Sequence, residues 1–326
     1  MATVYWNGSE DGDYSNATNW TGGLPGASDT VIFDGRTTTG PSTNLDEADD
    51  ILDAYIMPSC TYDIGTPSVY WEVQCSFRMV VEGTGTYHIR CGNGSAADTD
   101  IAKLIINSTG TVNLASEKNA NGGNVSLFAE IIINNGTVNL KGNADSVGNE
   151  SGTAYTTLII APGAGASPTV NVGDWCQDLK NSTHGNIEIS GGTLNIHSDI
   201  GTIRQAGGTV NYGSTAYSMA AGDDDISTLH LYGGTFNWQP SVVSASVRTT
   251  ASDSPNITIV NVYGGSFNAS SMLEKVTTDP TLNVTNLFGP GTVNLASGYA
   301  NFNIGSSFNN YGGTLTLGSG QDFTIQ

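Results

Sequence analysis

The chain has 326 residues, of which 30 are Asp or Glu and 10 are Lys or Arg, so its net charge is −20. Nucleic-acid backbones are bound through Lys and Arg, so this balance argues against a nucleic-acid partner. Every apolar run is much shorter than the roughly 20 residues of a transmembrane helix, which argues against a membrane-spanning helix. Short β-branched runs such as Ile131-Ile132-Ile133 predict an all-β chain with a sizeable core.

The N-terminal segment, positions 1–60, lacks the repeat that fills the rest of the chain. We expect residues 1–60 to form a capping or attachment segment and residues 61–326 to form a repetitive domain. One interpretation of Trp6 and Trp20 is that they plug the first coil of that domain, since a solenoid end exposes apolar surface and strand edges. The other is that they anchor a partner, because exposed aromatic residues mark interfaces.

The negative charge is concentrated near the N-terminus, where residues 1–100 hold 15 acidic residues and three arginines. This segment is therefore where we expect a partner surface. The residue pattern from Asn44 to Leu52 predicts a short helix, with Asn44 as N-cap and acidic residues in the first turn. The candidate partner-binding residues are Trp6, Trp20, Asp46, Glu47, Asp49 and Asp50.

The aromatic and turn residues of this segment follow a recognisable order. The chain reads Trp6-Asn7-Gly8, then Asn19-Trp20 with Pro25 shortly after, then Asp29-Thr30-Val31-Ile32-Phe33. This order resembles a motif at the start of β-helix repeats in bacterial surface proteins and phage-encoded proteins. The resemblance is confined to the stretch that ends at Phe33, and it implies an architecture rather than a function.

A pentapeptide of the form G-[TS]-x-N-x recurs along the rest of the chain. A degenerate copy begins at Gly85, a Pro-led copy at Pro168 and a last copy at Gly313. The mean spacing is roughly 25 residues, a period typical of solenoids. Another short strand precedes most copies. The regular copies contain the structural pairs Gly110 and Asn113, Gly136 and Asn139, Gly192 and Asn195, Gly208 and Asn211, Gly234 and Asn237, Gly265 and Asn268, and Gly291 and Asn294.

This repeat predicts a right-handed parallel β-helix, or β-solenoid, of about ten coils with roughly 25 residues per coil. Two short strands cannot bury their apolar face alone, whereas stacked coils bury a continuous core. In T-x-N-x the apolar residue points inward, and Thr and Asn point the other way. A propeller needs longer blades, and a sandwich would not explain one recurring pentapeptide.

The outward Thr and Asn side chains are expected to stack into ladders along the coils. Amides that hydrogen-bond along such a stack give a structural reason for the recurrence of Asn within the repeat. A flat Thr-rich face is also how β-solenoid ice-binding proteins work, which leaves ice binding as a minor hypothesis. Residues 142–157, 213–227 and 239–256 are expected to be long loops, and Cys60, Cys75 and Cys91 to be buried small residues.

Candidates for chemistry are few and weak. Asp223-Asp224-Asp225 is read as a solvated turn rather than a calcium site, and His197 with Asp199 as a surface pair rather than a metal site. We therefore expect no catalytic residues, no metal and no cofactor. A glycan-binding groove would need exposed aromatic residues; the candidates are Tyr212, Trp238 and Tyr263, of which the first two share the inward register of the repeat.

With a predicted β-helix and no visible signal segment, anchor or catalytic set, the chain resembles the β-helix proteins that phages use as head decoration, cement or fibre subunits. The resemblance implies a non-enzymatic virion protein, made in the host cytoplasm and located on the capsid surface. Its partner would be the major capsid protein or another virion protein, and it would form a homotrimer. The alternatives are a host-surface or glycan-binding tail fibre, tailspike or bacterial adhesin, and then a polysaccharide-degrading β-helix enzyme.

Overall fold

The computed structural model confirms an all-β parallel β-solenoid with about 25 residues per coil. Its only described helix is a single 3₁₀ turn, η1 (Ala17–Asn19). The chain divides into two compact units, Met1–Val170 and Asn171–Gln326. The structure describes residues 1–45, 49–91, 101–115, 128–141, 155–172, 184–196, 200–212, 225–238, 256–269, 281–295, 302–317 and 323–325.

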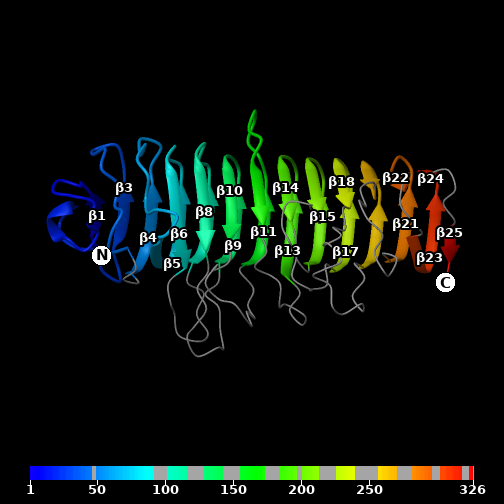
Figure 1. Cartoon of the computed structure of the whole chain (residues 1–326), viewed down its shortest axis with the longest axis horizontal. Helices are drawn as coiled ribbons and strands as arrows, with labels where there is room; N and C mark the ends of the chain where they lie inside the picture. Colours follow the sequence, from blue (N-terminus) through cyan, green and yellow to red (C-terminus); the bar gives the residue numbers. More distant parts are fainter. Residues whose placement is uncertain are drawn as a thin grey trace, which may run out of the picture. The chain divides into compact units, whose positions relative to one another are not determined.

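In the first unit, successive coils follow one another in chain order, and from β5 on each strand pairs with the next strand but one (Figure 1). Every described strand pairing in this unit is parallel except the one between β1 and the two-residue β2. The strands are β1 (Thr3–Trp6), β2 (Trp20–Thr21), β3 (Thr30–Phe33), β4 (Asp49–Ile56), β5 (Trp71–Val81), β6 (Thr86–Cys91), β7 (Ile101–Ile106), β8 (Thr111–Ala115), β9 (Phe128–Ile133), β10 (Thr137–Lys141), β11 (Tyr155–Ile160) and the start of β12 (Thr169–Val172).

The second unit repeats this arrangement, with each strand paired in parallel to the equivalent strand of the next coil. Its strands after β12 are β13 (His184–Ile189), β14 (Thr193–Ile196), β15 (Ile200–Gln205), β16 (Thr209–Tyr212), β17 (Asp225–Leu231), β18 (Thr235–Trp238), β19 (Asn256–Val262), β20 (Ser266–Asn268), β21 (Thr281–Phe288), β22 (Thr292–Leu295), β23 (Phe302–Tyr311), β24 (Thr314–Leu317) and β25 (Phe323–Ile325).

The solenoid has about eight coils, slightly fewer than the ten that the number of pentapeptide copies predicts. The two outermost copies depart from the regular pattern. The first copy lies on β6 and has His88 where the regular copies have Asn. The last copy lies on β24, has Thr316 at that position and leaves Leu317 41% exposed, so its apolar residues are not enclosed as in the regular coils.

The core is a set of apolar columns that run from coil to coil. Val210 pairs with Phe236, Phe236 with Phe267, and Phe267 with Val293, and all four side chains are fully buried. The regular pentapeptide strands alternate between half-buried and buried residues, as the T-x-N-x pattern predicts. The inward direction of the apolar residues is therefore confirmed.

The outward Asn side chains of these strands form a hydrogen-bonded amide ladder. In the second unit, Asn211 Nδ2 donates to Asn195 Oδ1 over 2.7 Å, Asn237 Nδ2 to Asn211 Oδ1 over 2.8 Å, and Asn268 Nδ2 to Asn237 Oδ1 over 3.1 Å. The first unit has the same bond between Asn139 and Asn113. These bonds confirm the structural interpretation of the recurring Asn.

The glycine that opens most of the regular pentapeptides has a positive φ and lies at a tight corner. At Gly234 the backbone φ is +78°, and a Cβ placed there would lie 2.4 Å from the carbonyl oxygen of Gly208 in the preceding coil. Only glycine adopts this conformation without strain, and only a residue without Cβ lets the two backbones approach so closely.

Parallel strand stacking begins well before residue 61, because β1, β3, β4 and β5 pair in parallel in that order. The helix predicted from Asn44 to Leu52 is wrong. Asn44 has a φ of +53°, and β4 begins at Asp49. Pairing with strands on both sides outweighs the local capping signal, and it buries alternate residues such as Ala54 and Ile56.

Candidate functional site

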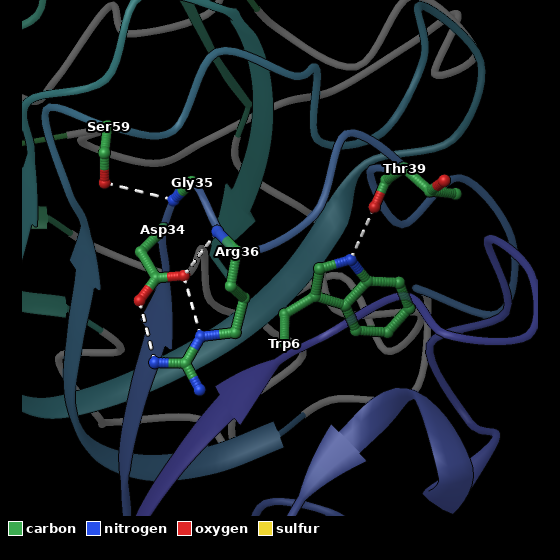
Figure 2. A network of polar contacts seen from close by, with 6 residues as sticks. All are labelled: Trp6, Asp34, Gly35, Arg36, Thr39 and Ser59. Carbon is green, nitrogen blue, oxygen red and sulfur yellow. Dashed lines mark hydrogen bonds and ion pairs between the residues drawn. The ribbon is translucent and has the colours of Figure 1, made fainter.

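The structure places Trp6 and Trp20 in a buried aromatic cluster. Their rings meet edge to face with centroids 5.1 Å apart, and Trp20 packs in the same way against Phe33. The indole N–H of Trp6 donates to the carbonyl of Thr39 over 2.7 Å (Figure 2). At 0% and 3% exposure, neither side chain offers a surface to a partner.

The loop beside this cluster is held by a local ion pair. Arg36 binds Asp34 through two nitrogens, at 2.8 and 2.9 Å, and the Gly35 N–H donates to Ser59 Oγ (Figure 2). The guanidinium also lies over the Tyr5 ring, 3.8 Å from its centroid. The hydrogen bond from Arg36 lowers the pKa of Asp34. Arg36 is thus engaged within the chain.

The predicted acidic partner surface is only partly visible. Asp50 is exposed at the start of β4. Asp46, Glu47 and the side chain of Asp49 lie outside the described residues. The partner-binding role of the acidic residues therefore stays a prediction.

A different feature dominates the described surface of the second unit. Four aromatic side chains stand in a row at the same corner of successive coils, and we call them the aromatic ladder. Their neighbouring ring centroids are 5.0, 4.9 and 5.0 Å apart, and the ring planes differ by only 7°, 8° and 15°. The aromatic ladder consists of Tyr232, Tyr263, Phe288 and Tyr311.

Strand register positions these rings. Tyr232 directly follows β17, and its N–H donates to the carbonyl of Gln205; Tyr263 directly follows β19, and its N–H donates to Leu231. Phe288 and Tyr311, the last residues of β21 and β23, are Cα partners. Because neighbouring parallel strands lie about 4.8 Å apart, equivalent flat side chains stack at nearly their preferred distance.

The ladder is open to solvent, and most open at its two ends. Tyr232 is 51% exposed and Tyr311 62%, whereas Tyr263, with a ring on each side, is 37% exposed. Each end ring therefore has one face that no other ring of the ladder covers. Exposed aromatic residues are enriched at binding surfaces, so the ladder is a candidate binding surface.

One imidazole flanks the ladder. The ring of His230 lies parallel to those of Tyr232 and Tyr263, with centroids 6.2 and 6.3 Å away, and its Nδ1 is 3.4 Å from the amide nitrogen of Asn261. Burial lowers the pKa of His230, and the charge of Arg204 lowers it further. The imidazole is therefore favoured in its neutral form, which can both donate and accept hydrogen bonds.

Sequence reasoning found one rung of the ladder and missed three. Tyr212 and Trp238 are fully buried, as their register in the repeat predicts. Tyr263 is exposed and belongs to the ladder. The missed signal is an aromatic residue directly before the paired small residues at the corner, seen in Tyr232-Gly233-Gly234 and Tyr311-Gly312-Gly313.

The other candidate sites named from the sequence are not supported by the described residues. Within the described ranges, no three His, Cys, Asp or Glu side chains gather as a metal site. His197, Asp199, Asp223 and Asp224 lie outside those ranges, as do most of the predicted long loops. In the part of the chain that can be described, no helix has the length and hydropathy to cross a membrane.

The two cysteines whose side chains are described are structural, whereas the side chain of Cys91 lies outside the described ones. Cys60 and Cys75 are buried and unbridged, which confirms the prediction for these two residues. Burial raises the pKa of both thiols, to about 12 for Cys75. Both therefore stay protonated and unreactive at neutral pH.

Comparisons of the whole chain with models of protein families, with curated proteins and with solved structures found no match. The function must therefore be argued from the residues themselves.

Proposed function

We propose that this chain is a non-enzymatic structural protein of a virion, of the capsid decoration or cement type, which docks on the capsid and stabilises it or projects from it. The observation that carries the proposal is that the repeat forms a continuous core and a regular outer surface. Its apolar columns and amide ladders make a stiff scaffold with a regular outer surface. The N-terminal motif, which resembles β-helix proteins of phages and bacterial surfaces, supports the β-helix architecture that this role uses.

In this role the protein would act by mass action. A subunit that binds only the assembled shell stabilises that shell in proportion to its bound fraction. Its partner would be the major capsid protein or another virion protein, and a homotrimer would give three copies of each docking surface. The excess of 20 negative charges would keep the decorated particle soluble.

The test is location and stoichiometry. We expect the chain in purified particles, detected by mass spectrometry, and in the pellet when purified protein is sedimented with capsids that lack it. Light scattering after gel filtration measures the oligomeric state independently. Absence from purified particles, or no cosedimentation with any capsid, would overturn the decoration proposal.

The exposed aromatic ladder favours a second candidate, a glycan-binding fibre or adhesin. Saccharides present apolar C–H faces that pack on aromatic rings, with hydroxyl groups at the rim for hydrogen bonds. Binding to a panel of immobilised glycans tests this role. The appearance of new reducing ends during incubation with a capsular polysaccharide would instead point to a polysaccharide-degrading enzyme.

A further inference from the structure

The Tyr232 end of the aromatic ladder is a step in the surface. The register that pairs Gln205 with Leu231 places Ala206 beside Tyr232, one coil toward the N-terminus. The same register places Ser190 beside Ala206. Ala206 and Ser190 are both exposed. Toward the N-terminal coils, the large ring of Tyr232 is thus followed by the small side chains of Ala206 and Ser190.

The space above Ala206 has the dimensions of one more rung. Neighbouring strands are about 4.8 Å apart, and the rings of Tyr232 and Tyr263 are separated by 5.0 Å. A flat group of ring thickness placed over Ala206 would therefore stack on Tyr232 as Tyr263 does on the opposite face. Half of the Tyr232 side chain is exposed, as such an open face requires.

A positive charge stands beside this space. Arg204 precedes Ala206 by two positions, at the end of β15, so both side chains lie on the outer face of the strand, and both are exposed. Among the described residues the guanidinium makes one hydrogen bond, to Asn186 Oδ1 at 3.4 Å. Although Glu188 is its Cα partner, no ion pair joins Arg204 to a carboxylate of the described residues.

We propose that Tyr232, Ala206 and Arg204 form a binding site for an acidic sugar. The sugar ring stacks on the open face of Tyr232, above Ala206, and its carboxylate accepts hydrogen bonds from Arg204. A planar guanidinium has five donors and matches a carboxylate with two parallel bonds. The chain has 30 acidic and 10 basic residues. Arg204 lies beside an aromatic face and outside any described ion pair, and it therefore gives the site its specificity for an anion.

The polar groups around the step suit a saccharide better than an aromatic acid. His230 is neutral and lies next to Tyr232, and the Ser190 side chain carries a hydroxyl. Ring hydroxyl groups of a sugar would find donors and acceptors at both places. The proposal deepens the glycan-binding alternative and does not depend on capsid docking.

The experiment is calorimetric titration of the full chain with three acidic probes: oligogalacturonate, alginate oligomers and oligosialic acid. The matched neutral probe is carboxyl-reduced oligogalacturonate. The variants are Tyr232→Ala, Arg204→Gln and Ala206→Phe. Ala206→Phe adds a rung to the ladder and fills the site at an exposed position, and its melting temperature shows whether the fold is kept. Phe77→Ala is the control, because Phe77 is 57% exposed but lies in the first unit.

We expect at least one acidic probe to bind, with at least tenfold preference over its neutral counterpart. All three site variants should lose at least tenfold in affinity, Phe77→Ala should not, and Ala206→Phe should melt no lower than the wild type. Unchanged affinity in Ala206→Phe, or no binding of any acidic probe, overturns this site. Neutral glycans that bind equally well to wild type and Ala206→Phe would keep the glycan-binding role and reject this site.

Discussion

Tyr232 and Tyr263 are far apart in the chain, yet their rings stack with centroids 5.0 Å apart and planes within 7°. The β-solenoid makes this possible, because its register places equivalent corners of successive coils one strand spacing apart whatever the length of the intervening loop. A residue type that recurs at one corner thus becomes a continuous surface. The aromatic ladder and the Asn ladder both arise in this way, one exposed and one half-buried.

Phe288 is an inner rung of the ladder, and we expect its removal to cost more than removal of an end rung. Phe288→Ala loses stacking on both Tyr263 and Tyr311, whereas Tyr311→Ala loses only the contact with Phe288. Each aromatic pair contributes on the order of 1 kcal/mol beyond area burial. Urea unfolding should show about twice the loss for Phe288→Ala. Equal losses would mean that the rings stack without stabilising the fold.

Asn211 links two neighbours of the amide ladder, and we expect Asn211→Asp to be more damaging than its small change in size suggests. The amide of Asn211 donates to Asn195 Oδ1 and accepts from Asn237 Nδ2. A carboxylate keeps the acceptor but faces Asn195 Oδ1 with a second acceptor. The loss should be about 1 kcal/mol, the net contribution of one hydrogen bond, at this half-buried position. Asn16→Asp, at an exposed N-cap where only acceptance is needed, is the control.

The architecture was predictable because the same physical constraint acts in every coil. Pairs such as Val210 and Phe236 alternate with Thr and Asn at a period of two, and the corner before them requires glycine at Gly234. Ten repetitions of a weak local signal make a strong one. The coil number was overestimated, since a count of pentapeptide copies includes a last copy whose Leu317 is 41% exposed.

The site was harder to predict, because it depends on side chains between coils rather than within one. The pentapeptide register correctly places Tyr212 and Trp238 in the core. It says nothing of Tyr232 or Phe288, which lie just before the corner. Each of them meets its stacking partners only after the coils stack. The helix expected at Asn44 failed for a related reason, since the partners of β4 are distant in sequence.

Gly234→Ala should destabilise the second unit strongly, whereas Gly163→Ala should not destabilise the chain. Alanine at position 234 meets both a positive φ and the Gly208 carbonyl, while a Cβ at position 163 has no neighbour within 4 Å. We expect a loss of more than about 1 kcal/mol at 234 and no loss, or a gain of about 0.4–1 kcal/mol, at 163. Thermal unfolding monitored by circular dichroism measures both. A tolerated Gly234→Ala would contradict the corner geometry.

Cys60 and Cys75 should resist alkylation in the folded protein. Both thiols are buried, and burial raises their pKa, so little reactive thiolate is present or accessible at pH 8. Peptide mapping after iodoacetamide treatment should find both unmodified in buffer and both modified in concentrated urea. Rapid modification of either one in buffer would show that its part of the core opens readily.

His230 should make the stability of the second unit depend on pH around neutrality. Its pKa is lowered in the folded state, by burial and then by Arg204, so the unfolded chain binds the proton more readily. Stability should therefore be greatest above the ordinary His pKa of about 6.5 and fall as the pH drops through that value. The other groups that face the imidazole are Tyr232, Tyr263 and Asn261.

Comparison with His230→Asn isolates this effect, because the next positions of the same column, Asn261, Asn286 and Asn309, already carry an amide. The free energy of unfolding, measured in urea at pH 5.5, 6.5 and 7.5, should fall more steeply toward acid for the wild type than for the variant. Identical slopes, or a wild type that gains stability toward acid relative to the variant, would show that the folded protein does not disfavour the protonated imidazole. The variant also separates the two roles of the imidazole: if acidic sugars still bind to it at neutral pH, His230 shapes stability, while Arg204 and Tyr232 make the essential contacts with the ligand.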